Sequence, residues 1–396
     1  MLAAHFNPDV AVATAERRSA EAGMTLAGQR PNPPASGLIQ KNQDIAAGTS
    51  PWTYGFLLEV PIEIAGKRGY RIEESQQRLN AAAWREADVR WQVRSRVRAS
   101  MLNAYPSDVI VNRLQSIQEE LVAAMDKRLT AGYISRPDLT QARLALNQAR
   151  LLSTEARKQQ AEGRARLASS IGVSAAALEG VVIEFTSFEG LPSIETLPET
   201  EARRQALLNR PDVLAALADY EASQSALQLE IAKQYPDVSI GPGYTWEEGA
   251  TKWSIGLSLV LPLLNQNQGG IAVAQAKREQ MAATFNAVQA RAIGEVEQAI
   301  AAYRHGLQTY ETAKDIARQQ LAGERTATTA FKAGQIDRTE WLSARYLAAA
   351  AEKSRVDALV QVQTALGHLE DALRRPLVDE ANERPLSQAR ALGETP

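Results

Sequence analysis

The chain contains 396 residues, of which 45% are hydrophobic, 6% aromatic and 23% charged, so it has enough apolar material for one or two folded cores. Lys and Arg total 44 against 46 Asp and Glu, and a net charge of -2 gives no general electrostatic reason to bind nucleic acid. The absence of Cys excludes disulfides, thiol catalysis, thiolate metal sites and lipid attachment through a Cys of this chain.

Long apolar segments and common catalytic motifs are both missing. The longest strongly apolar run, 256–264, contains Pro262 and is far shorter than the about 20 residues of a membrane helix. No HExxH, GxSxG or glycine-rich phosphate loop is present, so we expect neither an enzyme nor a cofactor. The N-terminus has no basic region followed by an apolar stretch, so an export signal is not visible in this chain.

The three His residues are scattered along the chain. His5, His305 and His368 have no second His and no Cys at ligand spacing, and the five Met residues show no paired spacing of a copper-binding kind. We therefore expect ordinary surface or interhelical roles for the His residues and no metal site.

An internal repeat spans nearly the whole chain. The PDV triplet at 8–10 recurs at 211–213. Segments 132–143 and 334–345 also match, because both begin with Gly, have Ile two residues later and end with Ala-Arg. A period of about 200 residues is too long for a solenoid unit. The sequence therefore predicts a duplicated domain.

Each copy is predicted to run as helix, two strands, very long helix, tip and helix. The first repeat, 1–172, has strands at about 33–45 and 52–64, a long helix at about 66–130, a tip at 129–143 and a helix to 172. The second repeat, 210–375, has strands at about 236–248 and 251–264, a long helix at about 270–332, a tip at 331–345 and a helix to 375. Residues 173–209 link the two copies, and 376–396 form a C-terminal tail.

The long helices carry the signals of lengthwise packing. About 60 residues at 1.5 Å each reach roughly 90 Å. Pro106 predicts a kink or local unwinding near 102–106 in the first long helix. An isolated coiled-coil rod would also have an apolar seam along its helices, but the predicted strands argue against such a rod. The seam of the second long helix has spacings of 3, 4, 3, 4 and 3 and consists of Ile293, Val296, Ile300, Tyr303, Leu307 and Tyr310.

The strands alternate apolar and polar side chains and have aromatic residues near their ends. This pattern fits transmembrane β-strands, although a soluble sheet packed on helices would alternate in the same way. Four strands cannot close a barrel alone, and an open edge in lipid costs several kcal/mol per unsatisfied backbone group, so we expect an oligomer. The predicted lipid-facing residues are Trp52, Tyr54, Phe56, Leu58, Val60, Ile62, Tyr244, Trp246, Trp253, Ile255, Leu257, Leu259 and Leu261.

Three sets of motifs resemble the TolC-like outer-membrane efflux proteins over about residues 7–375. The segments LTAGYISRPDLTQAR (129–143) and FKAGQIDRTEWLSAR (331–345) look like the tips of that family, and NPDV and RPDV resemble its repeat openings. VPIEIAGKRGYRI (60–72) is similar to the heavy-metal branch, which works with pumps of the cobalt-zinc-cadmium type.

The resemblance implies a mainly α fold with a membrane β-barrel contribution. Three copies would close a twelve-stranded barrel, and their helices would continue as a long α-helical periplasmic tunnel with a belt formed in part by 173–209. The implied protein is a passive exit duct for heavy-metal cations in the outer membrane, extending into the periplasm. Its implied partners are a periplasmic adaptor (membrane fusion) protein and an inner-membrane proton-driven RND pump.

Two alternatives stay open from the sequence. The same duct would also suit the export of organic drugs, because only the GKR segment and the overall similarity favour metals. A soluble coiled-coil periplasmic scaffold or adaptor is the alternative without a pore. An adaptor should carry a lipoyl-like β-domain between its hairpin helices, and the sequence shows none.

The two predicted tips carry charge clusters with two interpretations. Asp138 and Asp337 can accept backbone donors of a first helical turn and act as helix caps. In a threefold ring, the same clusters would form a periplasmic aperture, where carboxylates select cations and ion pairs hold the entrance shut. The candidate aperture residues are Arg136, Asp138, Asp337, Arg338 and Glu340, and the candidate adaptor contacts are Gly132, Ile134, Gly334 and Ile336. By resemblance, Glu340 matches a position where relatives carry an entrance Asp.

Overall fold

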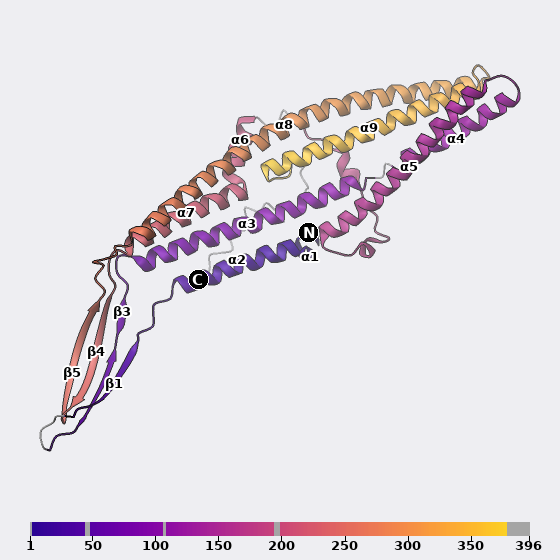
Figure 1. Cartoon of the computed structure of the whole chain (residues 1–396). Coiled ribbons are helices and arrows are strands. Elements are labelled where there is room, and N and C mark those ends of the chain that lie inside the picture. The colour runs from indigo at the N-terminus through magenta and orange to yellow at the C-terminus, as the bar shows by residue number, and fades with distance from the viewer. Residues whose placement is uncertain (1, 44–47, 106–107, 194–198, 378–396) are drawn as a thin grey trace. The chain divides into compact units, whose positions relative to one another are not determined.

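The computed structural model describes residues 2–43, 48–105, 108–193 and 199–377, which form long helices and one antiparallel sheet (Figure 1). The chain divides into two compact units. Unit 1 consists of 1–11, 88–210 and 291–396, and unit 2 consists of 12–87 and 211–290. Each unit therefore contains segments from both predicted repeats.

Helices make up most of the described chain, and three of them, α2, α3 and α8, contain residues of both units. The helices are α1 (Leu2–Phe6), α2 (Pro8–Ala27), α3 (Lys67–Asn103), α4 (Asp108–Thr130), α5 (Arg136–Ile171), α6 (Glu199–Asn209), α7 (Pro211–Ala232), α8 (Gln268–Lys332) and α9 (Arg338–Leu373). Within the described residues, none of them combines the length and the apolar character that crossing a membrane requires.

The sheet belongs to unit 2 and has β1 and β5 at its edges. Its strands are β1 (Ala35–Lys41), β2 (Trp52–Leu58), β3 (Val60–Ile62), β4 (Val238–Glu247) and β5 (Ala250–Leu259). β4 pairs with β2 and β3 on one side and with β5 on the other, and β1 pairs with β2. All pairs are antiparallel, so each copy contributes a hairpin and the two hairpins join through β2 and β4.

The predicted strand 52–64 is interrupted. β2 and β3 pair with β4 in one continuous register. The last pair of β2 is Leu57 with Gly243, so the next residue, Leu58, stands opposite Pro242. Because Pro has no N–H to donate, the ladder breaks at this position. The predicted strand 251–264 is also too long, since β5 ends at Leu259 and Leu263 then closes a tight turn onto the Leu261 carbonyl at 2.9 Å.

The core of unit 1 lies between α8 and α9. The predicted seam of α8 is confirmed from Val296 to Tyr310, with Val296, Ile300, Tyr303 and Tyr310 buried and Leu307 packed against them, whereas Ile293 is half-buried and lies outside this core. They meet a buried face of α9 that includes Leu359, Val362, Leu366, Leu369 and Leu373. The predicted linker 173–209 is not wholly irregular, because it contains α6, whose Ala202 and Ala206 join this core.

The first long helix is broken where the sequence predicts a kink. α3 ends at Asn103 and α4 begins at Asp108, while Pro106 lies outside the described residues. Gly163 of α5 packs against this break so closely that an added Cβ would lie 2.8 Å from the backbone of Asn103 and Ala104. The missing side chain therefore permits α5 to approach the chain at the end of α3.

The two repeat openings make equivalent contacts in unit 1. The buried Asn7, which precedes α2, donates from Nδ2 to the Ser170 carbonyl at 2.8 Å. The buried Arg210, which precedes α7, donates from Nη1 to the Ala372 carbonyl at 3.1 Å. The donors are 203 residues apart and the acceptors 202, so each copy ties its opening to the last turn of its own final helix.

The Gly163 contact generates a stability prediction. Gly163→Ala should lower the free energy of unfolding by about 1–3 kcal/mol, because the added methyl group meets backbone atoms that cannot rotate away. Gly294→Ala is the matched control, since an added Cβ there would meet nothing within 4 Å and Ala is the better helix former by about 1 kcal/mol. Denaturant unfolding of both variants measures this difference. Equal stability of the two would contradict the close packing.

Candidate functional site

The sheet of unit 2 gathers the predicted lipid-facing side chains on one face. Directly paired residues of antiparallel strands point to the same side, and the register pairs Tyr54 with Trp246 and Tyr244 with Trp253. Their ring centroids lie 5.8 and 5.1 Å apart. On β5, Trp253, Ile255 and Leu257 are 79%, 83% and 68% exposed. Large apolar side chains thus cover a face that the chain itself leaves open.

The other predicted face residues behave similarly, with one correction. Leu261 is exposed but lies beyond the end of β5, so its predicted place in a strand is wrong. The opposite face is mostly small or polar, with Ser239 paired to Ser258 and Gly243 paired to Ser254, and its two large apolar residues are Leu38 and Leu57. The remaining exposed residues of the apolar face are Trp52, Tyr54, Phe56, Val60, Ile62 and Leu259, while Leu58, Tyr244 and Trp246 are half-buried.

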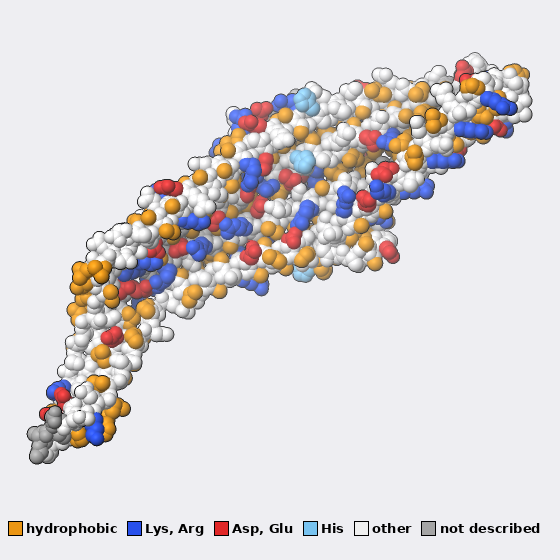
Figure 2. Space-filling view, in the orientation of Figure 1, with side chains coloured by type: hydrophobic (Ala, Val, Ile, Leu, Met, Phe, Trp, Pro, Cys, Tyr) orange, Lys and Arg blue, Asp and Glu red, His pale blue; other side chains and the backbone are white. Residues whose placement is uncertain are grey.

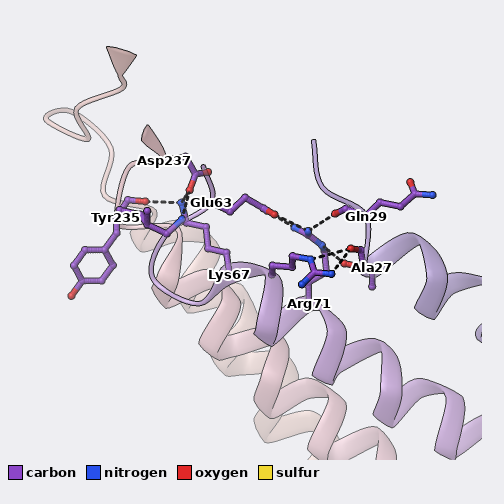
Figure 3. Close-up of polar contacts among 10 residues, drawn as sticks. Ala27, Gln29, Glu63, Lys67, Arg71, Tyr235 and Asp237 are labelled. Atoms are coloured by element: carbon purple, nitrogen blue, oxygen red, sulfur yellow. Dashed lines mark hydrogen bonds and ion pairs between the residues drawn. The ribbon is translucent and has the colours of Figure 1, made fainter. Parts of the chain in front are cut away.

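The GKR segment forms the junction between the first-repeat strands and α3 (Figure 3). Ala65 and Gly66 have left-handed backbone, with φ of 57° and 74°, which turns the chain so that α3 begins at Lys67. The buried Lys67 ammonium donates to the Tyr235 carbonyl at 2.6 Å and to Asp237 Oδ1 at 2.8 Å. One lysine of the first repeat therefore connects α3 to the chain that enters β4.

Two arginines complete this junction. Arg68 donates from Nε and Nη2 to the Gly28 carbonyl at 3.0 and 2.7 Å. Arg71 donates to the Ala27 carbonyl at 3.0 Å and to Glu63 Oε1 at 2.7 Å (Figure 3). These carbonyls belong to the C-terminal end of α2, where cations stabilise unpaired acceptors. We call Lys67, Arg68 and Arg71 the junction clamp.

The second repeat builds its junction from an amide. Asn267 has a φ of 60°, 202 positions after Ala65, and precedes α8. Its Nδ2 donates to the Glu230 carbonyl and to Glu230 Oε2, both at 2.8 Å. The two junctions of unit 2 thus share the turn but differ in the charge of the side chain that holds it.

The tip between α8 and α9, in unit 1, is held by Asp337. Its Oδ1 accepts the backbone N–H of Thr339 at 2.7 Å and of Glu340 at 2.9 Å, so Asp337 caps α9. Its Oδ2 pairs with Arg128 Nη1, from the end of α4, at 2.6 Å. Hydrogen bonds from the Thr339 hydroxyl and the Glu340 amide, together with Arg128, lower the pKa of Asp337 to about 2.

The tip between α4 and α5 is closed by a capping box. The Ser135 side chain caps α5, and Asp138 Oδ2 accepts the backbone N–H of Ser135 at 3.0 Å. Hydrogen bonds from the hydroxyl and the backbone N–H of Ser135 lower the pKa of Asp138. At both tips a left-handed Gly ends the preceding helix, Gly132 with a φ of 77° and Gly334 with a φ of 72°.

A second set of contacts joins α9 to α4 beside the tips. Glu120 lies 3.4 Å from Arg345 and 3.8 Å from Arg338. The Arg345 guanidinium also stands 4.8 Å from the centroid of Trp341, whose Nε1 donates to Thr328 of α8 at 3.1 Å. Trp341 therefore packs between α8 and an arginine that reaches α4.

The structure brings together only some of the predicted aperture residues. Asp337 and Arg338 contact α4, whereas Asp138 contacts its own cap, and neither the Arg136 nor the Glu340 side chain has an ion pair within the described chain. Sequence reasoning missed Arg128 and Glu120, because a partner on a neighbouring helix has no local signature. Of the predicted adaptor contacts, Gly132 and Gly334 are exposed, and Ile134 and Ile336 are half-buried.

Metal ligands do not cluster in the part of the chain that the structure describes. No group of three or more His, Asp or Glu residues there is arranged to hold a metal ion. His5, His305 and His368 are all exposed.

Comparison with known proteins identifies relatives over most of the chain. The family model described as outer membrane efflux protein matches residues 2–173 and 202–373. The cobalt-zinc-cadmium resistance protein CzcC of Cupriavidus metallidurans is 28% identical over 70% of this chain and 66% of its own length. The nickel and cobalt resistance protein CnrC of the same organism is 33% identical over 60% and 57%. The matched part is thus less than two thirds of the length of either relative. The predicted likeness to the heavy-metal branch is confirmed.

A solved structure shares the fold. The outer membrane protein VceC of Vibrio cholerae superposes with a TM-score of 0.75 at 17% sequence identity, covering 95% of this chain and 95% of its own. At this identity the likeness concerns the fold alone. The predicted combination of long helices with a β-domain of the TolC-like type is confirmed.

The junction clamp generates a prediction for unit 2. Lys67→Met should lower the free energy of unfolding by about 1.5–3 kcal/mol, because it removes a buried, charged donor from two acceptors. Lys158→Met is the control, since Lys158 forms an exposed pair with Glu155 outside both junctions that contributes about 0–1 kcal/mol. The measurement is thermal unfolding of the detergent-solubilised protein. Indistinguishable midpoints would show that the clamp contributes no more than a surface pair.

The Asp337 cap generates a prediction with a pH dependence. Because the folded pKa is lowered from 3.8 to about 2, the stabilisation is complete above pH 3.8 and is lost as the pH falls towards 2. Asp337→Ala should cost about 0.5–2 kcal/mol at neutral pH, and this difference from wild type should shrink below pH 3.8. Unfolding titrations between about pH 2 and 7 measure both effects. A difference that does not vary with pH would refute the role of the ionised carboxylate.

Proposed function

The chain belongs to the outer membrane efflux protein family, and on this premise we propose that it is the outer-membrane channel of a tripartite, proton-driven efflux system. It acts as a passive exit duct for heavy-metal cations across the periplasm and the outer membrane. The names of the relatives CzcC and CnrC, both metal resistance proteins, support this cargo.

The exposed apolar face of the sheet is the observation that carries the proposal. The face extends across the sheet from β1 through β2 and β3, which lie in line, to β4 and β5, and it includes the 83% exposed Ile255. In water such a face is unfavourable at about 25 cal/mol per Å² of apolar surface, whereas lipid removes this cost. The face therefore contacts the outer-membrane lipid, and the small, polar opposite face lines the duct.

Assembly follows from the sheet edges. β1 and β5 each have one neighbour, so a single chain leaves two rows of backbone groups unpaired. Lipid cannot satisfy these groups, so the edges of one chain pair with the edges of other copies. The resemblance to the TolC-like proteins implies that the number of copies is three, and we therefore propose a homotrimer with twelve strands.

The partners and the aperture complete the proposal. A periplasmic adaptor protein and an inner-membrane RND pump deliver the cargo, and the adaptor contacts the tips at Gly132, Ile134, Gly334 and Ile336. Asp337 pairs with Arg128 across two helices, which suits a latch of the closed entrance. The exposed side chains of Arg136, Arg338 and Glu340 extend the aperture, while Asp138 supports it as a cap.

Two other functions make different predictions. A duct for organic drugs would conduct ions in the same way but would protect cells against drugs rather than metals. A soluble coiled-coil scaffold would remain in solution without detergent and would not conduct. Resistance profiles and conductance therefore separate the three.

The proposal predicts insertion and conductance. The detergent-solubilised trimer should form ion-conducting pores in a planar bilayer, and its gene should restore growth of a metal-sensitive strain on cobalt, zinc or cadmium. Leu257→Arg should impair insertion by about 2–4 kcal/mol, because Leu257 lies on the apolar face. Ser258→Arg, the next residue on the opposite face, is the matched control and should insert normally. A monomer without conductance, or normal insertion of Leu257→Arg, would refute the lipid-facing role.

A further inference from the structure

An exposed apolar segment follows the last strand of unit 2. β5 ends at Leu259, and residues 260–264 belong to no strand of the described chain. The segment makes one tight turn, in which the Leu263 N–H donates to the Leu261 carbonyl at 2.9 Å. Figure 2 shows hydrophobic side chains gathered where the chain passes from β5 to α8 in Figure 1. The large side chains of the segment are at least 61% exposed, and they are Val260, Leu261, Leu263 and Leu264.

The duplication gives the two hairpins of the sheet one common register. Ser36 of β1 recurs 203 residues later as Ser239 of β4, and Gly55 of β2 recurs 201 residues later as Gly256 of β5. With these two shifts, every pair between β1 and β2 becomes an observed pair between β4 and β5. The shifts found in the sequence are therefore also structural equivalences.

The same shifts make 261–263 the second-repeat counterpart of β3, with Pro262 corresponding to Pro61. β3 is paired with β4, where Val60 stands opposite Ile240. The counterpart of β4 is β1, whose outer edge has no strand beside it in the described sheet. β1 and β5 lie at opposite edges of that sheet, so within one chain 261–263 cannot reach the strand that it corresponds to pairing with.

We propose that residues 260–263 become a β-strand only when copies of the chain assemble, by pairing with residues 35–38 of the neighbouring copy. The register follows from the internal pairing of β2 and β3 with β4, and it sets Leu261 opposite Gly37 of the neighbouring copy. This inference rests on the proposed function, because it specifies how the copies of the homotrimer join.

This register places apolar side chains together on both faces of the sheet. On the apolar face, Leu259 meets Ile39 of the neighbouring copy, which is 72% exposed in the single chain. On the opposite face, Val260 meets Leu38, one of the two large apolar residues of that face. A slip of one residue would set the apolar face of one copy beside the opposite face of the next, and a slip of two would separate Val260 from Leu38.

The ladder between copies lacks the break that is found inside the chain. The internal ladder is interrupted where Leu58 stands opposite Pro242. The counterpart of Pro242 on β1 is Ile39, which has a backbone N–H to donate. β5 and 260–263 therefore form one continuous strand against the neighbouring copy, and ladder hydrogen bonds replace the single bond of the turn at Leu263.

Lipid is the alternative neighbour of this segment. Lipid can cover the exposed leucine side chains, but it offers no hydrogen-bond partner to the backbone of 260–263 or to the outer edge of β1. A second copy covers the side chains and also pairs both rows of backbone groups. The backbone requirement therefore selects the second copy.

Pairs of cysteines test the register, because the chain has no Cys of its own. Val260→Cys with Leu38→Cys places two thiols directly opposite each other, with Cα atoms about 4.5–5.5 Å apart, where a disulfide forms without strain. Oxidation of the detergent-solubilised protein should join copies into covalent dimers and trimers on a non-reducing gel, and a reductant should separate them. Leu259→Cys with Ile39→Cys repeats the test on the apolar face and should give the same result.

Two further pairs are matched controls on the face of Val260 and Leu38. Ser258→Cys with Leu38→Cys imitates a slip of two residues, and it should cross-link about tenfold less because its Cα atoms are about 7–8 Å apart. Ser239→Cys with Ser258→Cys joins residues that are paired within one chain, so it should oxidise without linking copies.

The outcomes separate this inference from the proposed function. If the protein has the mass of a trimer but neither predicted pair links copies, the proposed strand is overturned while the duct stands. Cross-linking of the Ser258 and Leu38 variant as strong as that of the Val260 and Leu38 variant would overturn the register. If the wild-type protein remains a monomer in detergent, the proposed function itself fails.

Discussion

Antiparallel pairing of long helices through a repeating apolar seam is the interaction on which the rest of unit 1 depends. The seam uses two positions of each heptad, so the remaining positions can carry charged side chains or stay exposed. The ion pairs of Arg143 with Asp126 and of Arg150 with Glu119, between α4 and α5, recur at seven-residue spacing, and the core between α8 and α9 follows the same period. Because each pair reverses at a short tip, Asp337 and Ser135 have to cap the returning helices.

The sheet of unit 2 obeys the opposite constraint. Among the described residues, the large side chains of its apolar face, such as Trp253 and Ile255, are mostly exposed. Polar chemistry at the junction joins the strands to the helices, with the buried Lys67 bound to Asp237 and with Arg71 bound to Glu63 and the end of α2. A charged, directional clamp suits a place where the chain passes from helices to a sheet with an exposed apolar face.

The duplication preserves geometry more strictly than chemistry. Asn7 and Arg210 reach equivalent carbonyls, and Ala65 and Asn267 adopt the same left-handed turn. Arg210 also pairs with Glu295 of α8 at 2.7 Å, a contact that the shorter Asn7 cannot make. The family model matches each copy separately, which agrees with two halves that share a backbone plan.

Periodicity in the sequence determined the helices, the α8 seam and the alternating strands, and short motifs at the tips and the repeat openings carried the resemblance to the family. Both kinds of signal depend on residues close together in the chain. Only the tertiary structure decided the break opposite Pro242, the partners of Asp337 and Lys67, and the place of α6 in the core. Each of these depends on groups far apart in the chain, such as Arg128 and Asp337, and no local pattern encodes which distant side chain will lie within hydrogen-bonding distance.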